Sequence, residues 1–173
     1  MRKILFALTL AAAALPASAA LPTGARAPDF VANGALAGKP FQLRLKEELK
    51  KGPVVLYFFP KAFTKGCTLE AHAFSEAMPE FRRAGAQVIG MSADDLPTLK
   101  RFSVEACRSA FPVASATPAT IGAYDVALKA KPGLTERTSY VIDRSGRIVM
   151  VHSDSDWSQH VAKTLAAVRA LRN

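Results

Sequence analysis

PVVLYFFP, residues 53–60, is a continuous apolar segment of β-branched and aromatic residues with a proline at each end. Runs of this kind are typical of a central strand that is covered on both faces. Downstream, apolar residues recur at the helical spacings of three and four: Phe74, Ala77, Met78 and Phe81. This stripe predicts that a helix follows the buried strand.

Strands and helices alternate along the rest of the chain. Residues 20–39 are expected to form an extended lead-in. The other predicted elements are a short strand at 41–43, a helical turn at 45–51, a strand at 87–92, a helix at 96–108, a strand at 111–114, a helical turn at 120–124, strands at 138–142 and 148–151 joined by a tight turn, and a helix beginning near Ser155.

This order favours a mainly parallel sheet, to which the last hairpin adds an antiparallel edge. The predicted fold class is α/β, with a mixed central sheet flanked by helices. That is the plan of the thioredoxin-like fold.

Residues 1–19 have the pattern of a secretory signal peptide. Arg2 and Lys3 form a positive start, Ile4–Leu15 is apolar, and Ala17-Ser18-Ala19 offers a small-residue cleavage site. As a helix the apolar part would reach about 18 Å, against about 30 Å for a bilayer core, which favours cleavage over an uncleaved anchor. We expect cleavage after residue 19, export to the bacterial periplasm, no stable membrane insertion afterwards, and a single domain over residues 20–173.

The chain is basic, but its charge is spread out. It carries 23 Lys and Arg against 14 Asp and Glu, a formal net charge of +9, with no basic run longer than two residues. Nucleic-acid-binding proteins usually concentrate their charge on one face or tail. The pattern therefore indicates a solvated basic surface and argues against nucleic acid as a partner.

Cys67 lies where the first long strand gives way to the first long helix. Sheets of the α/β class place their functional sites at such strand ends. The first turn of a helix favours negative charge, and the thiolate is the reactive form of cysteine. Thr64 is expected to cap the helix with its hydroxyl and to reach a ligand over Cys67. Pro60 is expected to fix the exit from the strand and to shield the sulfur from water.

The residues around Cys67 carry a family resemblance. Pro60, Thr64 and Cys67 form the pattern P-x-x-x-T-x-x-C, which resembles the signature of peroxiredoxins. The adjoining Gly66-Cys67-Thr68-x-Glu70 resembles the bacterioferritin-comigratory-protein (PrxQ) branch of that family. The likeness extends from Gly24 to the stretch 137–148 and so covers most of the chain.

The resemblance implies a thiol peroxidase that needs no cofactor and no metal. Cys67 would attack the peroxide and become a sulfenic acid. Thr64 would hydrogen-bond the peroxide, and Pro60 would pack over the site. Arg137 would supply a fixed cation from a later strand, the alternative being an ordinary solvated cation beside Glu136. Hydrogen peroxide and small organic hydroperoxides are the expected substrates, a thioredoxin-like dithiol is the expected reductant, and a monomer or weak dimer is the expected state.

Cys107 is the other cysteine of the chain. A domain of this size does not need a disulfide to fold, so two cysteines in an exported chain indicate a structural bridge or a redox pair. Many members of the branch place a resolving cysteine five residues after the first, where this chain has His72. Others carry it in the second helix, which Cys107 resembles. It would condense with the Cys67 sulfenic acid; a small core residue is the alternative.

Three other functions remain open on the sequence. An exported thiol–disulfide oxidoreductase would normally have C-x-x-C, and a copper-handling module would have C-x-x-x-C with a histidine, but neither pattern begins at Cys67. A non-catalytic binding module on the same fold is the third. Glu70 is expected to orient loop groups or to complement the helix dipole. Trp157 and His160 are expected to be packing or surface residues.

Overall fold

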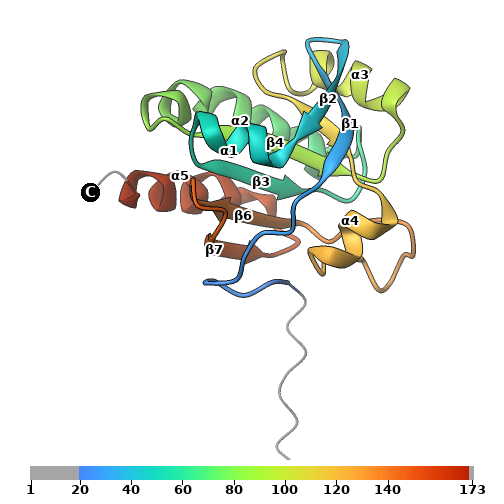
Figure 1. Ribbon diagram of the computed structural model, residues 1–173. Coiled ribbons are helices and arrows are strands. Elements are labelled where there is room, and N and C mark those ends of the chain that lie inside the picture. The colour runs from blue at the N-terminus through green and yellow to red at the C-terminus, as the bar shows by residue number, and fades with distance from the viewer. Residues whose placement is uncertain (1–19, 172–173) are drawn as a thin grey trace, which may run out of the picture.

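The computed structural model describes residues 20–171, so the predicted signal peptide at residues 1–19 lies outside the described part of the chain. Seven strands form one sheet in the order β2-β1-β5-β4-β3-β6-β7 (Figure 1). They are β1 (Val31–Leu36), β2 (Lys39–Arg44), β3 (Val54–Phe58), β4 (Gln87–Ser92), β5 (Val113–Ser115), β6 (Thr138–Ile142) and β7 (Ile148–Ser153). The pairs β3–β4 and β4–β5 are parallel, and β1–β2, β1–β5, β3–β6 and β6–β7 are antiparallel. The predicted mixed sheet is confirmed.

Helices cover both faces of this sheet. They are α1 (Leu45–Lys51), α2 (Lys65–Arg83), α3 (Leu96–Glu105), α4 (Pro118–Ala123) and α5 (His160–Ala170), with a 3₁₀ turn at Trp157–Gln159. Buried residues of α2, α3 and α5 share one apolar cluster, and those of α1 and α4 share another. Figure 1 shows α2 and α5 side by side, in agreement with their contacts. Within residues 20–171, no helix has the length and apolar character needed to cross a bilayer.

The position of β3 in the sheet explains why its sequence is apolar without a break. Val55 and Tyr57 face the cluster under α2, whereas Val54, Leu56 and Phe58 face the cluster under α1 and α4. All five residues are fully buried. Successive side chains of a strand point to opposite faces, so a strand covered on both sides needs apolar residues at every position.

The N-terminal edge of the sheet differs from the prediction. Residues 31–36, expected within an extended lead-in, form β1, which pairs with both β2 and β5. The inward positions of β1 are held by Ala32, Gly34 and Ala35. Small residues give only a weak alternating apolar signal, so this strand depends on its neighbours for pairing rather than on local pattern.

The second long helix is shorter than predicted. α3 ends at Glu105 with Ala106 as its C-cap, whereas the sequence suggested a helix to residue 108. Arg108 and Ser109 have φ angles of 50° and 58°. This left-handed backbone cannot continue a right-handed helix. Cys107 therefore lies in the turn beyond α3, not inside the helix.

Candidate active site

The loop between β3 and α2 is fixed by the start of the β4–α3 connection and by α3 itself. The Asp94 carboxylate accepts a hydrogen bond of 2.7 Å from the Ala62 amide. Phe63 has a φ of 64°, an uncommon conformation for a bulky residue. Its ring packs edge-on against Phe102 at 5.3 Å between centroids and lies 5.0 Å from the Arg101 guanidinium. These contacts set the point at which α2 begins.

Cys67 is the third residue of α2 and is only 1% exposed. Thr64 is the N-cap residue, but its hydroxyl donates to Lys61 O at 3.0 Å and caps no amide. The predicted side-chain cap is therefore wrong, because the short hydroxyl is turned back to close its own loop. The first-turn N–H groups keep the partial positive charge that favours a thiolate at Cys67. Pro60, which follows β3, is half-buried, and Thr64 is exposed.

Arg137 reaches the sulfur from the strand beside β3. It directly precedes β6 and is 8% exposed, so it is not a solvated surface cation. Its Nη2 lies 3.5 Å from Cys67 Sγ, its Nη1 pairs with the Glu70 carboxylate, and its Nε donates to Ser155 O at 3.0 Å. Three partners on three nitrogens of a planar group fix both its position and its orientation.

Glu70 and His160 complete a buried network that was not predicted. Glu70 lies one turn after Cys67 on α2, and His160 is the first residue of α5; both are fully buried. His160 Nδ1 lies 3.7 Å from Glu70 Oε1 and 2.8 Å from Ser139 Oγ. His160 is therefore buried, as the packing alternative predicted, but its hydrogen bonds in a polar network were not predicted. The acidic residue one turn after Cys67 was a visible signal, but nothing in the sequence indicated its partner in α5.

Burial controls the protonation of these groups. Loss of water raises the pKa of Glu70 to about 8, although the Arg137 charge opposes the rise. Burial also lowers the pKa of His160 to about 4, so the imidazole is neutral at pH 7. Its Nε2 lies 3.1 Å from Asp154 O, which can only accept, so Nε2 carries the hydrogen and Nδ1 accepts from Ser139 Oγ.

Arg137 keeps its charge in these surroundings. Burial by itself lowers the pKa of Arg137, but the charges of Glu70 and Cys67 more than offset it, and the pKa is raised. A permanent cation therefore stands beside the Cys67 sulfur. Such a cation favours the thiolate and can stabilise negative charge that develops on a bound oxygen.

Gly66 allows this close approach. A β-carbon at Gly66 would lie 3.3 Å from Arg137 Nη2 and 3.8 Å from Trp157 Cδ1. A side chain at position 66 would therefore press directly on the guanidinium. Trp157 is half-buried and lies beside the first turn of α2, which makes it a neighbour of the site.

Cys107 has very different surroundings. It is fully buried, and burial raises the pKa of its thiol. Its carbonyl accepts hydrogen bonds from Ser75 Oγ at 2.8 Å and from the Ala110 amide at 2.9 Å. Both cysteines are free thiols, so no disulfide joins them in this structure.

The two cysteines must move to meet. Ser75, which contacts the Cys107 turn, lies about 12 Å beyond Cys67 along the axis of α2, at about 1.5 Å per residue. A disulfide needs its Cα atoms within about 7 Å. The Cys107 turn is therefore tied to α2 about two turns beyond Cys67, and the two free thiols have to approach each other from these positions.

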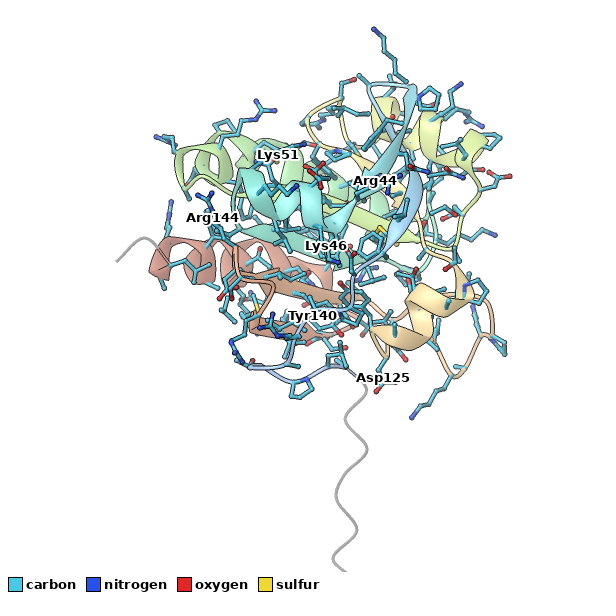
Figure 2. The ribbon with its side chains drawn as sticks, viewed as in Figure 1. Arg44, Lys46, Lys51, Asp125, Tyr140 and Arg144 are labelled. Atoms are coloured by element: carbon cyan, nitrogen blue, oxygen red, sulfur yellow. The ribbon has the colours of Figure 1, made fainter. Side chains whose placement is uncertain are left out.

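Other features of the surface are separate from this site. Within residues 20–171, no three His, Cys, Asp or Glu side chains gather so as to hold a metal ion. A hollow of about 540 Å³ lies between the lead-in segment, α1 and the β6–β7 turn, and its lining includes Arg26, Lys46, Lys50 and Arg144. Figure 2 shows Lys46 and Arg144 on that side of the molecule. None of the lining residues belongs to the Cys67 site.

Comparisons with known proteins identify a matching family and related chains. The model of the AhpC/TSA family matches residues 23–151. A Mycobacterium tuberculosis protein named as a peroxiredoxin is 34% identical over 137 residues, which are 75% of this chain and 86% of that protein.

Solved structures with a similar fold include chains at more than 25% identity. The crystal structure of peroxidoxin BcpB from Mycobacterium tuberculosis has a TM-score of 0.78 and 33% identity, covering 87% of this chain and 98% of that one. The bacterioferritin comigratory protein of Xanthomonas campestris, solved to study its alkyl peroxide reduction activity, has a TM-score of 0.71 and 30% identity, covering 82% and 92%.

Proposed function

Because the chain belongs to the AhpC/TSA family and is a peroxiredoxin, we propose that Cys67 is the residue that attacks the peroxide. The protein is a thiol-dependent peroxidase, an oxidoreductase. One observation carries the assignment of Cys67. Its sulfur lies at the start of α2, 3.5 Å from the nitrogen of a buried arginine.

The first step is a displacement at oxygen. The Cys67 thiolate attacks the terminal oxygen of ROOH, an S–O bond forms and the O–O bond breaks. The sulfur is oxidised to a sulfenic acid, and RO⁻ takes a proton and leaves as water or alcohol. Negative charge passes from sulfur to the leaving oxygen, so Arg137 and the first-turn N–H groups stabilise both ends of the step.

Thr64 and Pro60 orient the substrate. Thr64 Oγ1 donates its hydrogen to Lys61 O, which leaves its lone pairs free to accept the O–H of the peroxide. Pro60 precedes this loop and offers no N–H, so it leaves the peroxide no competing donor. In this arrangement Thr64 orients the peroxide O–H, and Arg137 orients the oxygen that is attacked.

Small hydroperoxides are the substrate class we propose. Cys67 is almost covered, so only a small head group can reach its sulfur. Phe63 and Leu69, each 39% exposed, flank Cys67 in the chain and offer apolar surface to an organic substituent. Hydrogen peroxide and small alkyl hydroperoxides fit these surroundings.

Cys107 is the proposed resolving cysteine. Its thiol condenses with the Cys67 sulfenic acid to give a disulfide and water, and a thioredoxin-like dithiol then reduces the disulfide. The free state of both thiols and their burial in one apolar cluster support this role. The proposal also includes a signal peptide at residues 1–19, release into the bacterial periplasm, and a monomer or weak dimer. These three points are supported by the sequence alone.

The alternative functions are less well supported. A thiol–disulfide oxidoreductase normally needs a second cysteine three positions after the first, and Glu70 occupies that position as the partner of Arg137. A purely binding module would not need a thiol held beside a buried cation. The family comparisons also favour the peroxidase.

Stoichiometric oxidation tests the proposal. The reduced protein, residues 20–173, is mixed with one equivalent of hydrogen peroxide, and the products are followed by mass spectrometry. We expect a 67–107 disulfide within seconds. Cys67→Ser should be inert, and Cys107→Ser should stop at the sulfenic acid or be over-oxidised.

A Cys107→Ser variant that turns over normally with a dithiol would show that Cys107 is not the resolving residue. Rapid peroxide consumption by Cys67→Ser would contradict the assignment of the nucleophile. His72→Cys in the Cys107→Ser background tests whether a thiol five residues after Cys67 can form the disulfide with Cys67 in place of Cys107.

A further inference from the structure

Arg137 is held on two sides by different parts of the chain. Its Nη1 pairs with the carboxylate of Glu70, which belongs to α2. Its Nε donates to Ser155 O at 3.0 Å, and the backbone N–H of Asp154 donates to Arg137 O at 3.1 Å. Residues 154–156, the segment that connects β7 to the 3₁₀ turn, therefore contact both the backbone and the side chain of Arg137.

This connecting segment is exposed, although the guanidinium that it holds is buried. Asp154, Ser155 and Asp156 are all exposed to solvent, whereas Arg137 is 8% exposed. Exposed connections are usually the more mobile parts of a fold. A carbonyl on such a segment can fix a guanidinium only if the segment is itself held in place.

His160 anchors the connecting segment from the interior. It is the first residue of α5 and is fully buried. Its Nε2 donates at 3.1 Å to Asp154 O, the carbonyl that precedes Ser155 O along the chain. Its Nδ1 lies 2.8 Å from the hydroxyl of Ser139, which is in β6, two residues after Arg137. One imidazole therefore joins α5, the connecting segment and the strand that follows Arg137.

Packing alone does not account for a histidine at this position. A buried polar ring costs free energy unless its nitrogens are hydrogen-bonded, and an apolar side chain would avoid that cost. Both nitrogens of His160 have a partner, and both partners lie close to Arg137 along the fold. The distance from His160 Nδ1 to Glu70 Oε1, 3.7 Å, is too long for a hydrogen bond, so His160 acts on the side of Arg137 opposite to the carboxylate.

We propose that His160 is a positioning residue for the reaction at Cys67: it holds the connecting segment, and the segment holds the Arg137 guanidinium. The inference rests on the proposed role of Cys67 as the nucleophile. His160 acts through the backbone of the segment and not by contact with the peroxide. Because a misplacement of about 1 Å can lower a rate by up to about 10²-fold, a guanidinium with a loose Nε acceptor stabilises the developing charge less well.

Substitutions at position 160 separate the two hydrogen bonds of the imidazole. The amide of glutamine reaches the ε position, so His160→Gln can still donate to Asp154 O. The amide of asparagine ends at the δ position, so His160→Asn can accept from Ser139 Oγ but does not reach Asp154 O. His160→Leu makes neither hydrogen bond. The second-order rate of Cys67 oxidation by hydrogen peroxide should fall by about tenfold in His160→Asn and His160→Leu and stay within about threefold of wild type in His160→Gln.

A double-mutant cycle distinguishes positioning from general damage to the fold. Arg137→Lys has already lost the Nε hydrogen bond, so adding His160→Leu should lower the rate further by less than about twofold. Tyr140→Phe, which loses a hydrogen bond on the other face of the sheet, is the control for destabilisation and should keep the wild-type rate.

NMR gives a readout that does not depend on activity. The ¹H–¹⁵N signal of Arg137 Nε–H is assigned by its absence from Arg137→Lys. Its exchange with water should become faster in His160→Asn and His160→Leu and stay slow in His160→Gln and Tyr140→Phe, because only the first two release the connecting segment.

Equal slowing of oxidation in His160→Gln and His160→Asn overturns the inference, as does a fully additive loss in the Arg137→Lys background. If His160→Leu does not fold, the comparison of His160→Gln with His160→Asn decides, because each keeps one polar contact and loses the other. Failure of the proposed function is a separate result: Cys67→Ser would then consume peroxide as fast as wild type, while the Arg137 signal would still report whether His160 holds the segment.

Discussion

Cys67 and Cys107 occupy opposite kinds of environment within one apolar cluster. Cys67 stands at a helix N-terminus beside Arg137, which is held in turn by Glu70 and Ser155. Cys107 stands in an apolar turn fixed through its backbone by Ser75. Polar side chains define the surroundings of the first thiol, whereas backbone contacts define those of the second.

The difference separates two requirements of the reaction. In the proposed reaction the first thiol attacks the peroxide, and its surroundings are already complete in the reduced protein. The proposed resolving thiol stays unreactive until Cys67 is oxidised, and burial, which raises its pKa, keeps it neutral. Both regions contain left-handed backbone, at Phe63 before Cys67 and at Arg108 and Ser109 after Cys107.

The largest expected effect comes from the cation beside Cys67. Arg137→Lys keeps a charge but cannot bond to Cys67, Glu70 and Ser155 O together, as the guanidinium does. We expect the second-order rate of Cys67 oxidation to fall by about 10²-fold, the usual cost of one lost transition-state donor. Stopped-flow measurement of thiol loss gives this rate.

Arg144→Lys is the control, because Arg144 lies at the separate hollow near α1 (Figure 2) and should leave the rate unchanged. A rate for Arg137→Lys within threefold of wild type would mean that any nearby cation is sufficient. The contrast between the two cysteines would then depend only on the positive charge near Cys67 and not on the fixed orientation of the Arg137 guanidinium.

A smaller effect is expected at the Cys107 turn. Ser75→Ala removes the hydrogen-bonding hydroxyl that lies 2.8 Å from both Cys107 O and Ala71 O. The folded protein should lose about 1 kcal/mol, the usual worth of such a bond, and disulfide formation after sulfenic acid formation should become severalfold faster because the turn is freer. Urea denaturation and single-turnover kinetics measure the two effects.

Tyr140→Phe, which loses a hydrogen bond on the other face of the sheet, controls for general destabilisation. It should lower stability without accelerating disulfide formation. Slower disulfide formation in Ser75→Ala would indicate that Ser75 holds Cys107 ready for attack and does not restrain it.

The smallest effect concerns pH. Burial raises the pKa of Glu70 from 4.5 to about 8, so between these values the folded state binds a proton that the unfolded state has lost, and stability falls as pH rises. Burial lowers the pKa of His160 from 6.5 to about 4, so between these values stability rises with pH. Above pH 6.5 His160 is neutral in both the folded and the unfolded state, so of these two groups only Glu70 still makes stability depend on pH.

The melting temperature should therefore fall by a few degrees between pH 6.5 and 8.5. Glu70→Gln should remove most of that fall, because the glutamine does not titrate. Thermal unfolding in a Cys67→Ser background keeps ionisation of that thiol out of the curve. An equal fall in the Glu70→Gln protein would assign the dependence to other groups.

The sequence alone determined the main elements and the place of Cys67 in the fold. The apolar run before Pro60, the strand at 87–92 and the hairpin strand at 138–142 were predicted within a residue or two, because their patterns depend on burial that repeats along the strand. Cys67 was placed correctly at a strand–helix junction. Arg137 was identified through the family resemblance, and the structure places it 3.5 Å from the sulfur.

Only the tertiary structure decided which strands pair and which buried side chains contact one another. β1 exists because β2 and β5 supply its hydrogen bonds, since its small inward residues give little local signal. Glu70 and His160 meet across two helices far apart in the chain. Local patterns report a residue's near neighbours along the chain, whereas the charge or proton that a buried group carries is set by the distant segments that exclude water from it.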